Sequence, residues 1–244
     1  MSAGLVLEGV GKNFGGLKAV SDVSFAVPEG AIVGLMGANG AGKTTLFALI
    51  AGNERPSEGA IRFDGPRIDG LSPDRVVKKG IARTFQIVRP FAGLSVRDNV
   101  RVAALYGRGG FAGSAEDWVA AVLDETGLAE QADKPAQALT LSGRKRLEVA
   151  RALATRPRLL LLDEVLAGLT PTEVAEALVM LRAIQAKHGL AILVIEHVMK
   201  ALMRLCATIV VLHHGLKIAE GTPEAIAADP AVIEAYLGES AAHA

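Results

Sequence analysis

The sequence has little of what marks secreted, membrane-spanning or nucleic-acid-binding proteins. Only one of its 244 residues is a cysteine, Cys206, which excludes a disulfide within the chain. Half of the residues are hydrophobic, yet no uninterrupted apolar run reaches the roughly 18 residues that a membrane-spanning helix needs. Lys and Arg together number 26, and so do Asp and Glu, so no overall charge attracts nucleic acid or anionic lipid.

The first four residues lack the basic start and the apolar core of a signal peptide, and we expect a soluble, cytosolic protein. A chain of this length suffices for one large α/β domain with an inserted subdomain. Its apolar content predicts a thick core and a face that a partner covers.

One segment between a predicted strand and a predicted helix has the spacing of a phosphate-binding loop. Residues 37–44 match the pattern G-x-x-x-x-G-K-[ST] at every fixed position. An apolar strand over 31–36 leads into the loop, and a helix over 44–51 leaves it. Glycines let backbone N–H groups turn toward phosphate oxygens, and the helix N-terminus adds positive potential. The predicted ligand is a triphosphate, and its predicted binding residues are Gly37, Ala38, Asn39, Gly40, Ala41, Gly42, Lys43, Thr44 and Thr45.

Two residues of this loop have expected chemical roles. Lys43 is expected to reach the β- and γ-phosphates and to act in catalysis, and the Thr44 hydroxyl is expected to bind Mg²⁺. Ahead of the loop, Phe14 lies in a glycine-bounded turn, where an aromatic ring can stack on adenine. An ordinary core or hairpin phenylalanine fits this spacing equally well.

Two adjacent carboxylates follow a second strong strand signal. Residues 159–162 are four leucines, which is typical of a parallel strand buried on both faces. Active sites of open α/β sheets lie beyond the carboxyl ends of the strands, where Asp163 and Glu164 stand. We expect Asp163 to hold Mg²⁺, directly or through water, and Glu164 to polarise the attacking water. A salt-bridged strand end is the structural alternative.

A third apolar strand, over 191–195, ends in Glu196 and His197. His197 is expected to hydrogen-bond the γ-phosphate at this edge, although a lone histidine is more often an ordinary surface or core residue. His213 and His214 are interpreted as turn residues of a closing hairpin, because a metal site needs more ligands.

The remaining pattern predicts one domain with several parts. Alternating segments at 5–10, 20–27 and 60–65 predict an antiparallel sheet beside the main parallel one. From 95 to 154 the apolar spacing is helical, which predicts an inserted helical subdomain. We assign residues 1–86 and 155–220 to an α/β core with a β subdomain, 87–154 to the helical subdomain, and 221–244 to a C-terminal helical tail.

The order of these motifs resembles the ATP-binding-cassette (ABC) ATPases over essentially the whole chain. The phosphate loop is followed by Gln86, a glycine-containing segment before Arg151, the leucine run with its two acids, and His197. Within that superfamily, four stretches look like the ATPase subunits of branched-chain amino acid importers: 14–20, 80–86, 195–199 and 234–239.

The resemblance implies a RecA-like P-loop NTPase core and the hydrolysis of ATP, with Mg²⁺, to power solute import. It implies that Phe14 stacks on adenine and that Gln86 contacts Mg²⁺, acts in catalysis and couples the site to permease subunits through residues 87–93. The helical subdomain is expected to contact the permease as well. The protein would therefore lie at the inner face of the plasma membrane, linked indirectly to a solute-binding protein.

The resemblance also implies a head-to-tail dimer, in which each ATP lies between the phosphate loop of one subunit and the signature segment of the other. Aligned on residues 146–151, the family's Leu-Ser-Gly-Gly-Gln falls on residues 139–143. Thr140 then replaces the serine, and Ser142 replaces a glycine whose N–H approaches the γ-phosphate. Thr140, Ser142 and Gly143 complete the candidate nucleotide-binding set.

A second departure from the family pattern follows the acidic pair. Val165 stands where the family usually has proline, and Thr170 stands where it has aspartate. Both departures lie on surfaces that the resemblance offers to the opposite subunit. We therefore hypothesise that the chain's own phosphate-loop site is competent and that the site it completes for its partner is weaker.

Two other functions remain open. Duplicated cassettes, coiled-coil inserts or a basic face would favour a soluble cassette ATPase that acts on DNA, ribosomes or metal clusters, and the sequence contains none of these. The second is a nucleotide-gated clamp that does not hydrolyse ATP. Glu164 and His197 argue against it, because such a clamp does not need them. Urea, amides and aromatic acids stand beside branched-chain amino acids as candidate solutes, and both a homodimer and a heterodimer fit the sequence.

Overall fold

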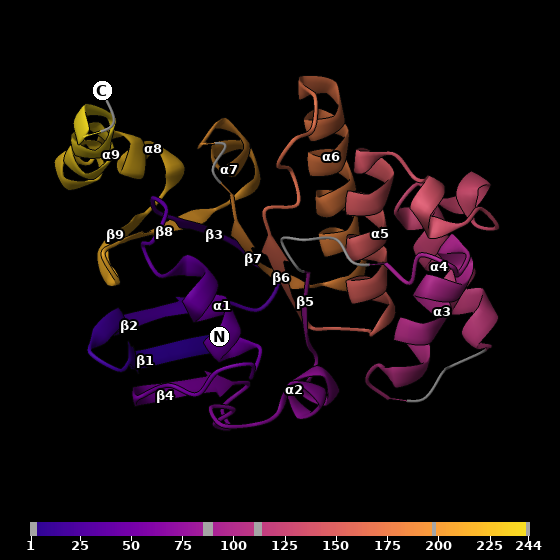
Figure 1. The fold of residues 1–244 in the computed structure, drawn as a ribbon, viewed down its shortest axis with the longest axis horizontal. Coiled ribbons are helices and arrows are strands. Elements are labelled where there is room, and N and C mark those ends of the chain that lie inside the picture. Colours follow the sequence, from indigo (N-terminus) through magenta and orange to yellow (C-terminus); the bar gives the residue numbers. More distant parts are fainter. Residues whose placement is uncertain (1–3, 85–89, 110–113, 197–198, 243–244) are drawn as a thin grey trace. The chain divides into compact units, whose positions relative to one another are not determined.

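The computed structural model describes residues 4–84, 90–109, 114–196 and 199–242, with the side chains from 237 onward left out. The chain forms two compact units (Figure 1). The first unit combines residues 1–72 with 191–244, and the second unit is residues 73–190. Each unit is described by itself.

An antiparallel sheet in the first unit has the strand order β2-β1-β4 (Figure 1). Its strands are β1 (Leu5–Phe14), β2 (Leu17–Val27) and β4 (Glu58–Phe63), and they confirm the predicted antiparallel sheet. β1 runs past the predicted end at residue 10 because its pairing shifts register around Gly9, whose φ is 57°. A bulge of this kind interrupts the alternation of buried and exposed residues on which the prediction depended.

The parallel strands of the first unit have the order β7-β3-β8, and β9 pairs antiparallel with β8. They are β3 (Ile32–Met36), β7 (Ala191–Ile195), β8 (Thr208–His213) and β9 (Leu216–Gly221). Every residue of β3 and β7 is buried, as expected of strands covered on both faces. The unit's helices are α1 (Lys43–Ile50), α7 (Met199–Leu205), α8 (Pro223–Ala228) and α9 (Pro230–Ala242).

The second unit contains two parallel strands and most of the long helices. β5 (Ile81–Arg83) pairs with β6 (Leu159–Asp163), and all residues of β6 are buried. The helices are α2 (Pro73–Lys79), α3 (Val96–Tyr106), α4 (Ala115–Glu125), α5 (Leu141–Ala154) and α6 (Pro171–His188), with short 3₁₀ turns at Ala129–Gln131 and Ala136–Ala138. α3, α4 and α5 pack against one another and confirm the helical block predicted for 95–154. The predicted limits of the subdomain, 87 and 154, stay a prediction.

Hydroxyl side chains set the starts of the four longest helices of this unit. Each N-cap hydroxyl accepts the backbone N–H three residues further on, which satisfies one of the unpaired donors at a helix start. The N-caps are Ser95, Ser114, Thr140 and Thr170.

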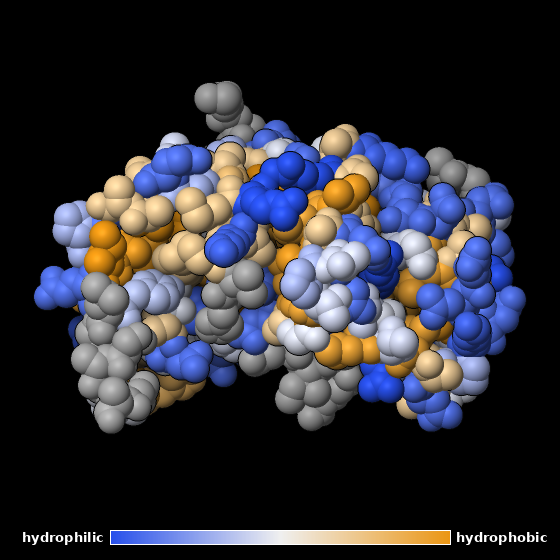
Figure 2. All heavy atoms as spheres, turned by 90° about the horizontal axis from the view of Figure 1, so that it is seen from above, coloured by the Kyte–Doolittle hydropathy of each residue, from blue (hydrophilic) through white to orange (hydrophobic). Residues whose placement is uncertain are grey.

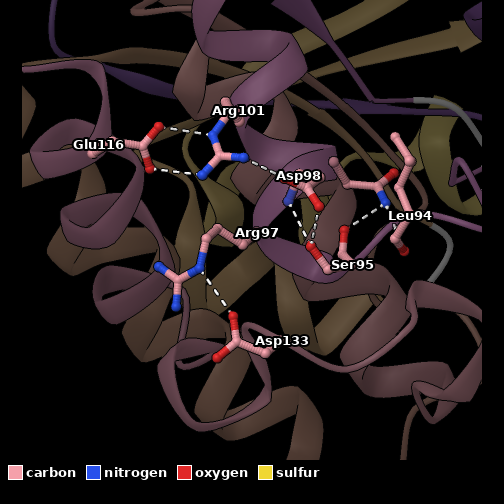
Figure 3. Close-up of polar contacts among 8 residues, drawn as sticks. Leu94, Ser95, Arg97, Asp98, Arg101, Glu116 and Asp133 are labelled. Carbon is pink, nitrogen blue, oxygen red and sulfur yellow. Dashed lines mark hydrogen bonds and ion pairs between the residues drawn. The ribbon is translucent and has the colours of Figure 1, made fainter.

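Surface ion pairs join α3 to α4 and to the turn after α4 (Figure 3). The Arg101 guanidinium contacts both carboxylate oxygens of Glu116, at 2.7 and 2.8 Å, and also pairs with Asp98. Arg97 pairs with Asp133 at 3.0 Å. Such exposed pairs contribute little stability each, so the apolar contacts between the helices provide most of it.

Apolar residues are scattered among polar ones on the face that Figure 2 shows. Large exposed hydrophobic side chains in the described part of the chain include Leu17, Phe91, Leu105 and Val179. No helix among the described residues is both long and apolar enough to cross a membrane.

Candidate functional site

The loop of residues 37–42 joins β3 to α1 in the first unit. A Cβ on Gly37 would lie 2.4 Å from the Leu212 carbonyl oxygen, and one on Gly42 would lie 2.6 Å from the Ala19 carbonyl oxygen. Gly42 also has a φ of 100°. Gly40 has a φ of 80°, and no atom lies within 4 Å of the position that a Cβ on it would take. Only glycine adopts these angles at little cost. The two motif glycines are therefore required by the space around them as well as by the turn.

The helix that follows begins at Lys43 without a side-chain cap. Its first N–H groups and its dipole suit an anion. Lys43 is 6% exposed, and its ammonium donates to the carbonyl oxygens of Gly37 at 2.6 Å and Ala38 at 2.8 Å. The ammonium thus lies inside the loop, where phosphate oxygens would be stronger acceptors than these carbonyls. Thr44 is exposed at the start of the same helix.

Phe14 lies at the end of β1 and is 44% exposed, so it is not a core residue. The Lys12 ammonium lies 4.7 Å from the centre of its ring. Lys12 is held in turn by Glu54 at 2.8 Å and by the Arg55 carbonyl at 2.9 Å. One face of the ring therefore has a cation, an arrangement that is favourable for an aromatic ring.

Asp163 ends β6 in the second unit and is 1% exposed. Arg83 Nη2 lies 2.8 Å from Asp163 Oδ2, and the Asp163 N–H donates to the Thr84 hydroxyl at 3.0 Å. The salt bridge considered as an alternative is therefore present, but it uses one carboxylate oxygen. In the described part of the chain, Asp163 Oδ1 is buried without a hydrogen-bond partner.

A buried carboxylate oxygen without a donor fits a hard cation such as Mg²⁺. The described residues contain no cluster of three or more His, Cys, Asp or Glu side chains that would hold a metal by itself. Mg²⁺ commonly binds through one or two carboxylates together with water and substrate phosphates. The donor set around Asp163 therefore fits a metal that arrives with a nucleotide.

Glu164 follows Asp163 with an unusual backbone. Its φ is 51°, in the left-handed region, and its carbonyl accepts the Ala167 N–H at 3.3 Å. The buried ammonium of Lys145, on α5, donates to the same carbonyl at 2.7 Å. Left-handed residues other than glycine are uncommon and are concentrated at functional sites.

Comparison with known proteins gives the context of these features. The profile of the ABC transporter family matches residues 20–167, and that of the branched-chain amino acid ATP-binding cassette transporters matches residues 217–242. The chain belongs to the ABC transporter family.

Relatives of this ABC protein match along nearly its whole length. It is 40% identical to the high-affinity branched-chain amino acid transport ATP-binding protein BraF of Pseudomonas aeruginosa, and 38% identical to LivG, of the same description, from Escherichia coli. Each alignment covers 97% of this chain and 98% of the relative.

Solved structures agree with the fold. A nucleotide-free ATP-binding cassette from an ABC transporter superposes with a TM-score of 0.88 at 27% identity, covering 96% of this chain and 98% of that one. The ADP conformation of another cassette has a TM-score of 0.88 at 28% identity, covering 98% of this chain and 100% of that one. The predicted α/β P-loop NTPase fold is confirmed.

The family membership also confirms the general activity. ABC cassettes bind ATP or ADP and hydrolyse ATP to power transport. Subunits of this kind dimerise and pair with membrane permease components. The roles of individual residues in this ABC protein stay predictions.

The signature segment of the ABC protein begins α5. Thr140 is the N-cap, and its hydroxyl accepts the Gly143 N–H at 3.2 Å. Thr170 caps α6 in the same way and bonds to Glu173, through its N–H at 2.8 Å and its hydroxyl at 2.9 Å. The Thr170 N–H and hydroxyl, the charge of Arg146 and the Ser142 hydroxyl hold the pKa of Glu173 below its usual range. Ser142 and Thr170, two of the residues that depart from the family pattern, therefore both act on one carboxylate.

Other predicted site residues fall elsewhere. Gln86 and His197 lie outside the described residues, and Glu196, before His197, is 2% exposed. The phosphate loop belongs to the first unit and the acidic pair to the second, so their predicted meeting at one nucleotide stays a prediction.

Two cations beside the acidic pair escaped the sequence analysis. Arg83 lies in the stretch 80–86 that supported the family resemblance, but no motif assigned it to Asp163. Lys145 follows the signature segment, with only the surrounding apolar helix positions to suggest that it is buried. Arg83 follows two apolar residues of its strand, whereas Lys145 stands between two arginines, so its helical spacing from apolar residues was the available signal.

Proposed function

We propose that this ABC protein is the ATP-hydrolysing subunit of an importer for branched-chain amino acids. The observation that carries the proposal is the 38–40% identity, over 97% of the chain, to the branched-chain amino acid transport proteins BraF and LivG. The separate C-terminal match at residues 217–242 supports it. Importers of amides, urea or aromatic acids are the alternative within the same family.

In this proposal the phosphate loop and Lys43 bind the triphosphate, and Phe14 stacks on the adenine. Thr44, Gln86 and Asp163 would hold Mg²⁺, which would neutralise charge on the phosphates. Asp163 Oδ1, which has no hydrogen-bond partner among the residues that the structure describes, supports its part in that set. Arg83 and Thr84 keep the Asp163 side chain and N–H in place from β5.

Glu164 accepts a proton from the water that attacks the γ-phosphate, and His197 hydrogen-bonds that phosphate. Together, Lys43, Glu164, Gln86 and His197 form the proposed catalytic set. The exposed position of Phe14, with a cation on one face, supports its part in stacking.

The proposed permease contact is the Gln86 loop together with the helical subdomain. Asn99, on α3, is 0% exposed and fixes the end of that loop. Its side chain accepts the Phe91 N–H at 2.9 Å and donates to the Phe91 and Ser95 carbonyls at 3.1 and 2.9 Å. Phe91 and Leu94 are nevertheless 47% and 39% exposed. A fixed backbone that presents apolar side chains is typical of a surface that binds a partner.

Reconstitution with the cognate permease and solute-binding protein tests the proposed function. ATP turnover is expected to rise with leucine, isoleucine or valine and to be unaffected by urea or an aromatic acid. Stimulation by urea or an aromatic acid alone would favour the alternative importer. Turnover that needs no permease and responds to no solute would favour a soluble cassette ATPase.

Cross-linking tests the permease surface. Cysteine at Phe91 or Leu94 is expected to cross-link to the permease, whereas cysteine at Val179, which is 69% exposed, is the control. The native Cys206 is buried and interferes little. Equal cross-linking at all three positions would contradict the proposed surface.

The weaker trans site is part of the same proposal. The Thr170 hydroxyl bonds to Glu173 of its own subunit at 2.9 Å, and the Ser142 hydroxyl helps to lower the pKa of the same carboxyl, which supports a reduced contact with a partner's nucleotide. Ser142→Gly with Thr170→Asp is expected to raise the ATP turnover of the purified homodimer by a few-fold. Full activity of the unmodified homodimer would count against this idea.

A further inference from the structure

Glu164 is held in a conformation that its own sequence does not favour. Its φ of 51° places a residue with a Cβ in the left-handed region. The turn that it opens closes through the Ala167 N–H, at 3.3 Å from the Glu164 carbonyl oxygen. That distance is beyond the usual range for such a bond, so the turn alone holds the carbonyl weakly. Strained backbone persists only where the surroundings determine it.

A buried ammonium provides that support. Lys145 Nζ donates to the Glu164 carbonyl at 2.7 Å, and Lys145 is 8% exposed. The lysine also lines a small cavity together with the apolar side chains of Val165, Leu166 and Leu181. A charge-assisted hydrogen bond in such surroundings is shorter and stronger than one between neutral groups.

The helix that carries Lys145 is firmly packed. It lies on α5, whose residues Leu147, Glu148, Val149 and Ala150 are all buried. The start of that helix is fixed by the Thr140 cap. A group on a packed helix holds its partner more closely than one on a loop, which is what a functional side chain requires.

We propose that Lys145 is a positioning residue for Glu164. Its ammonium fixes the Glu164 carbonyl and so maintains the left-handed backbone from which the carboxylate meets the attacking water. Lys145 does not contact nucleotide in this role. The inference rests on the proposed ATP hydrolysis and adds to it the residue that holds the general base in place.

Lys145→Met tests the proposal, because it keeps an unbranched side chain, one atom shorter, and removes the donor. The kcat for ATP is expected to fall about ten- to a hundredfold, which corresponds to the loss of one charge-assisted hydrogen bond. The KM and the Kd for ATP are expected to stay within about twofold, because the change acts on hydrolysis and not on binding.

Lys78→Met is the matched control. Lys78 also donates to a backbone carbonyl at 2.7 Å, that of Gly107, but it is exposed and lies on α2. Its kcat is expected to equal that of the unmodified protein. Equal losses in the two variants would overturn the proposal, because any lysine-to-carbonyl bond would then have the same effect.

Two further variants separate positioning from stability. Lys145→Arg keeps a cationic donor and is expected to restore kcat to within about threefold. Glu164→Gln with Lys145→Met is expected to bind ATP and form a closed dimer as Glu164→Gln does alone. If Lys145→Met does not fold, Lys145→Gln replaces it, with an intermediate kcat expected from its neutral donor.

An unchanged kcat in Lys145→Met, or a parallel loss of kcat and ATP binding, would overturn the positioning role. If the unmodified protein bound ATP but did not hydrolyse it, the proposed function would fail instead. Hydrolysis by the unmodified protein together with an unaltered Lys145→Met would remove only the inference about Lys145.

Discussion

The phosphate loop and the acidic end of β6 hold their key groups in different ways. In the loop, residues close in sequence position the lysine: Gly42 turns the chain, and the Lys43 ammonium donates to carbonyls of the same loop. At the end of β6, residues distant in the sequence hold the acidic pair in place. Arg83 holds Asp163 across 80 positions, and Lys145 holds Glu164 across 19.

The difference explains why a motif finds the first site in full and the second only in part. A loop whose lysine bonds to carbonyls of the same loop requires particular residues at fixed spacing. A strand end built from long-range contacts requires only that some cation reaches the right oxygen. The two regions are therefore expected to respond differently to substitution, in binding, hydrolysis and stability.

The largest expected effect separates hydrolysis from binding at the acidic end. Glu164→Gln should lower ATP turnover by about 10²–10⁴-fold, the range for loss of a general base. ATP affinity should be retained, so a closed dimer should accumulate and appear as an ATP-dependent rise in mass by light scattering. Unchanged hydrolysis would remove Glu164 from its role.

The phosphate loop is expected to behave in the opposite way. Lys43→Ala should weaken ATP binding by about a hundredfold or more, because a buried cation no longer meets the phosphates. Calorimetric titration with ATP measures this. Normal affinity together with lost turnover would place Lys43 in catalysis alone, and normal turnover would contradict the site.

Arg83→Met tests the long-range support of Asp163. Removing one partner of a buried ion pair costs about 3–5 kcal/mol of unfolding free energy. Because the side chains of Arg83 and Asp163 are only 10% and 1% exposed, a loss in this range is expected in urea unfolding without nucleotide. Arg97→Met, whose partner Asp133 is exposed, should change stability by less than about 1 kcal/mol.

The double variant Arg83→Met with Asp163→Asn sharpens this test. With both charges removed, no uncompensated ion is left in the interior, and much of the lost stability should return. Additive losses from the two substitutions would show that the pair does not interact in the way that its 2.8 Å contact indicates.

The smallest effect distinguishes two glycines of one loop. Gly40→Ala should cost about 1–2 kcal/mol of unfolding free energy, since its φ of 80° is the only obstacle. Gly42→Ala should cost more, because its Cβ would also meet the Ala19 carbonyl at 2.6 Å. Thermal unfolding compares the two directly, and equal losses would contradict the crowding at Gly42.

Much of this protein follows from local pattern. The leucine run before Asp163, the apolar β7 and the helical spacing between 95 and 154 each predicted an element that the structure contains. The extension of β1 to Phe14 was missed, because the bulge at Gly9 breaks the alternation of the strand. Arg83 and Lys145 were missed, because a basic residue in a sequence does not indicate which distant oxygen it will reach.

The sequence by itself determined the phosphate loop and the buried strands, since each depends on residues close together in the chain, and it determined the family through the order of such local motifs. Only the tertiary structure decided that Asp163 has one oxygen in an ion pair and the other without a partner among the described residues, and that the carbonyl of the left-handed Glu164 accepts a hydrogen bond from a lysine. The physical reason is that burial raises the cost of an unpaired charge, and only packing decides which charges are buried and what lies within reach of them.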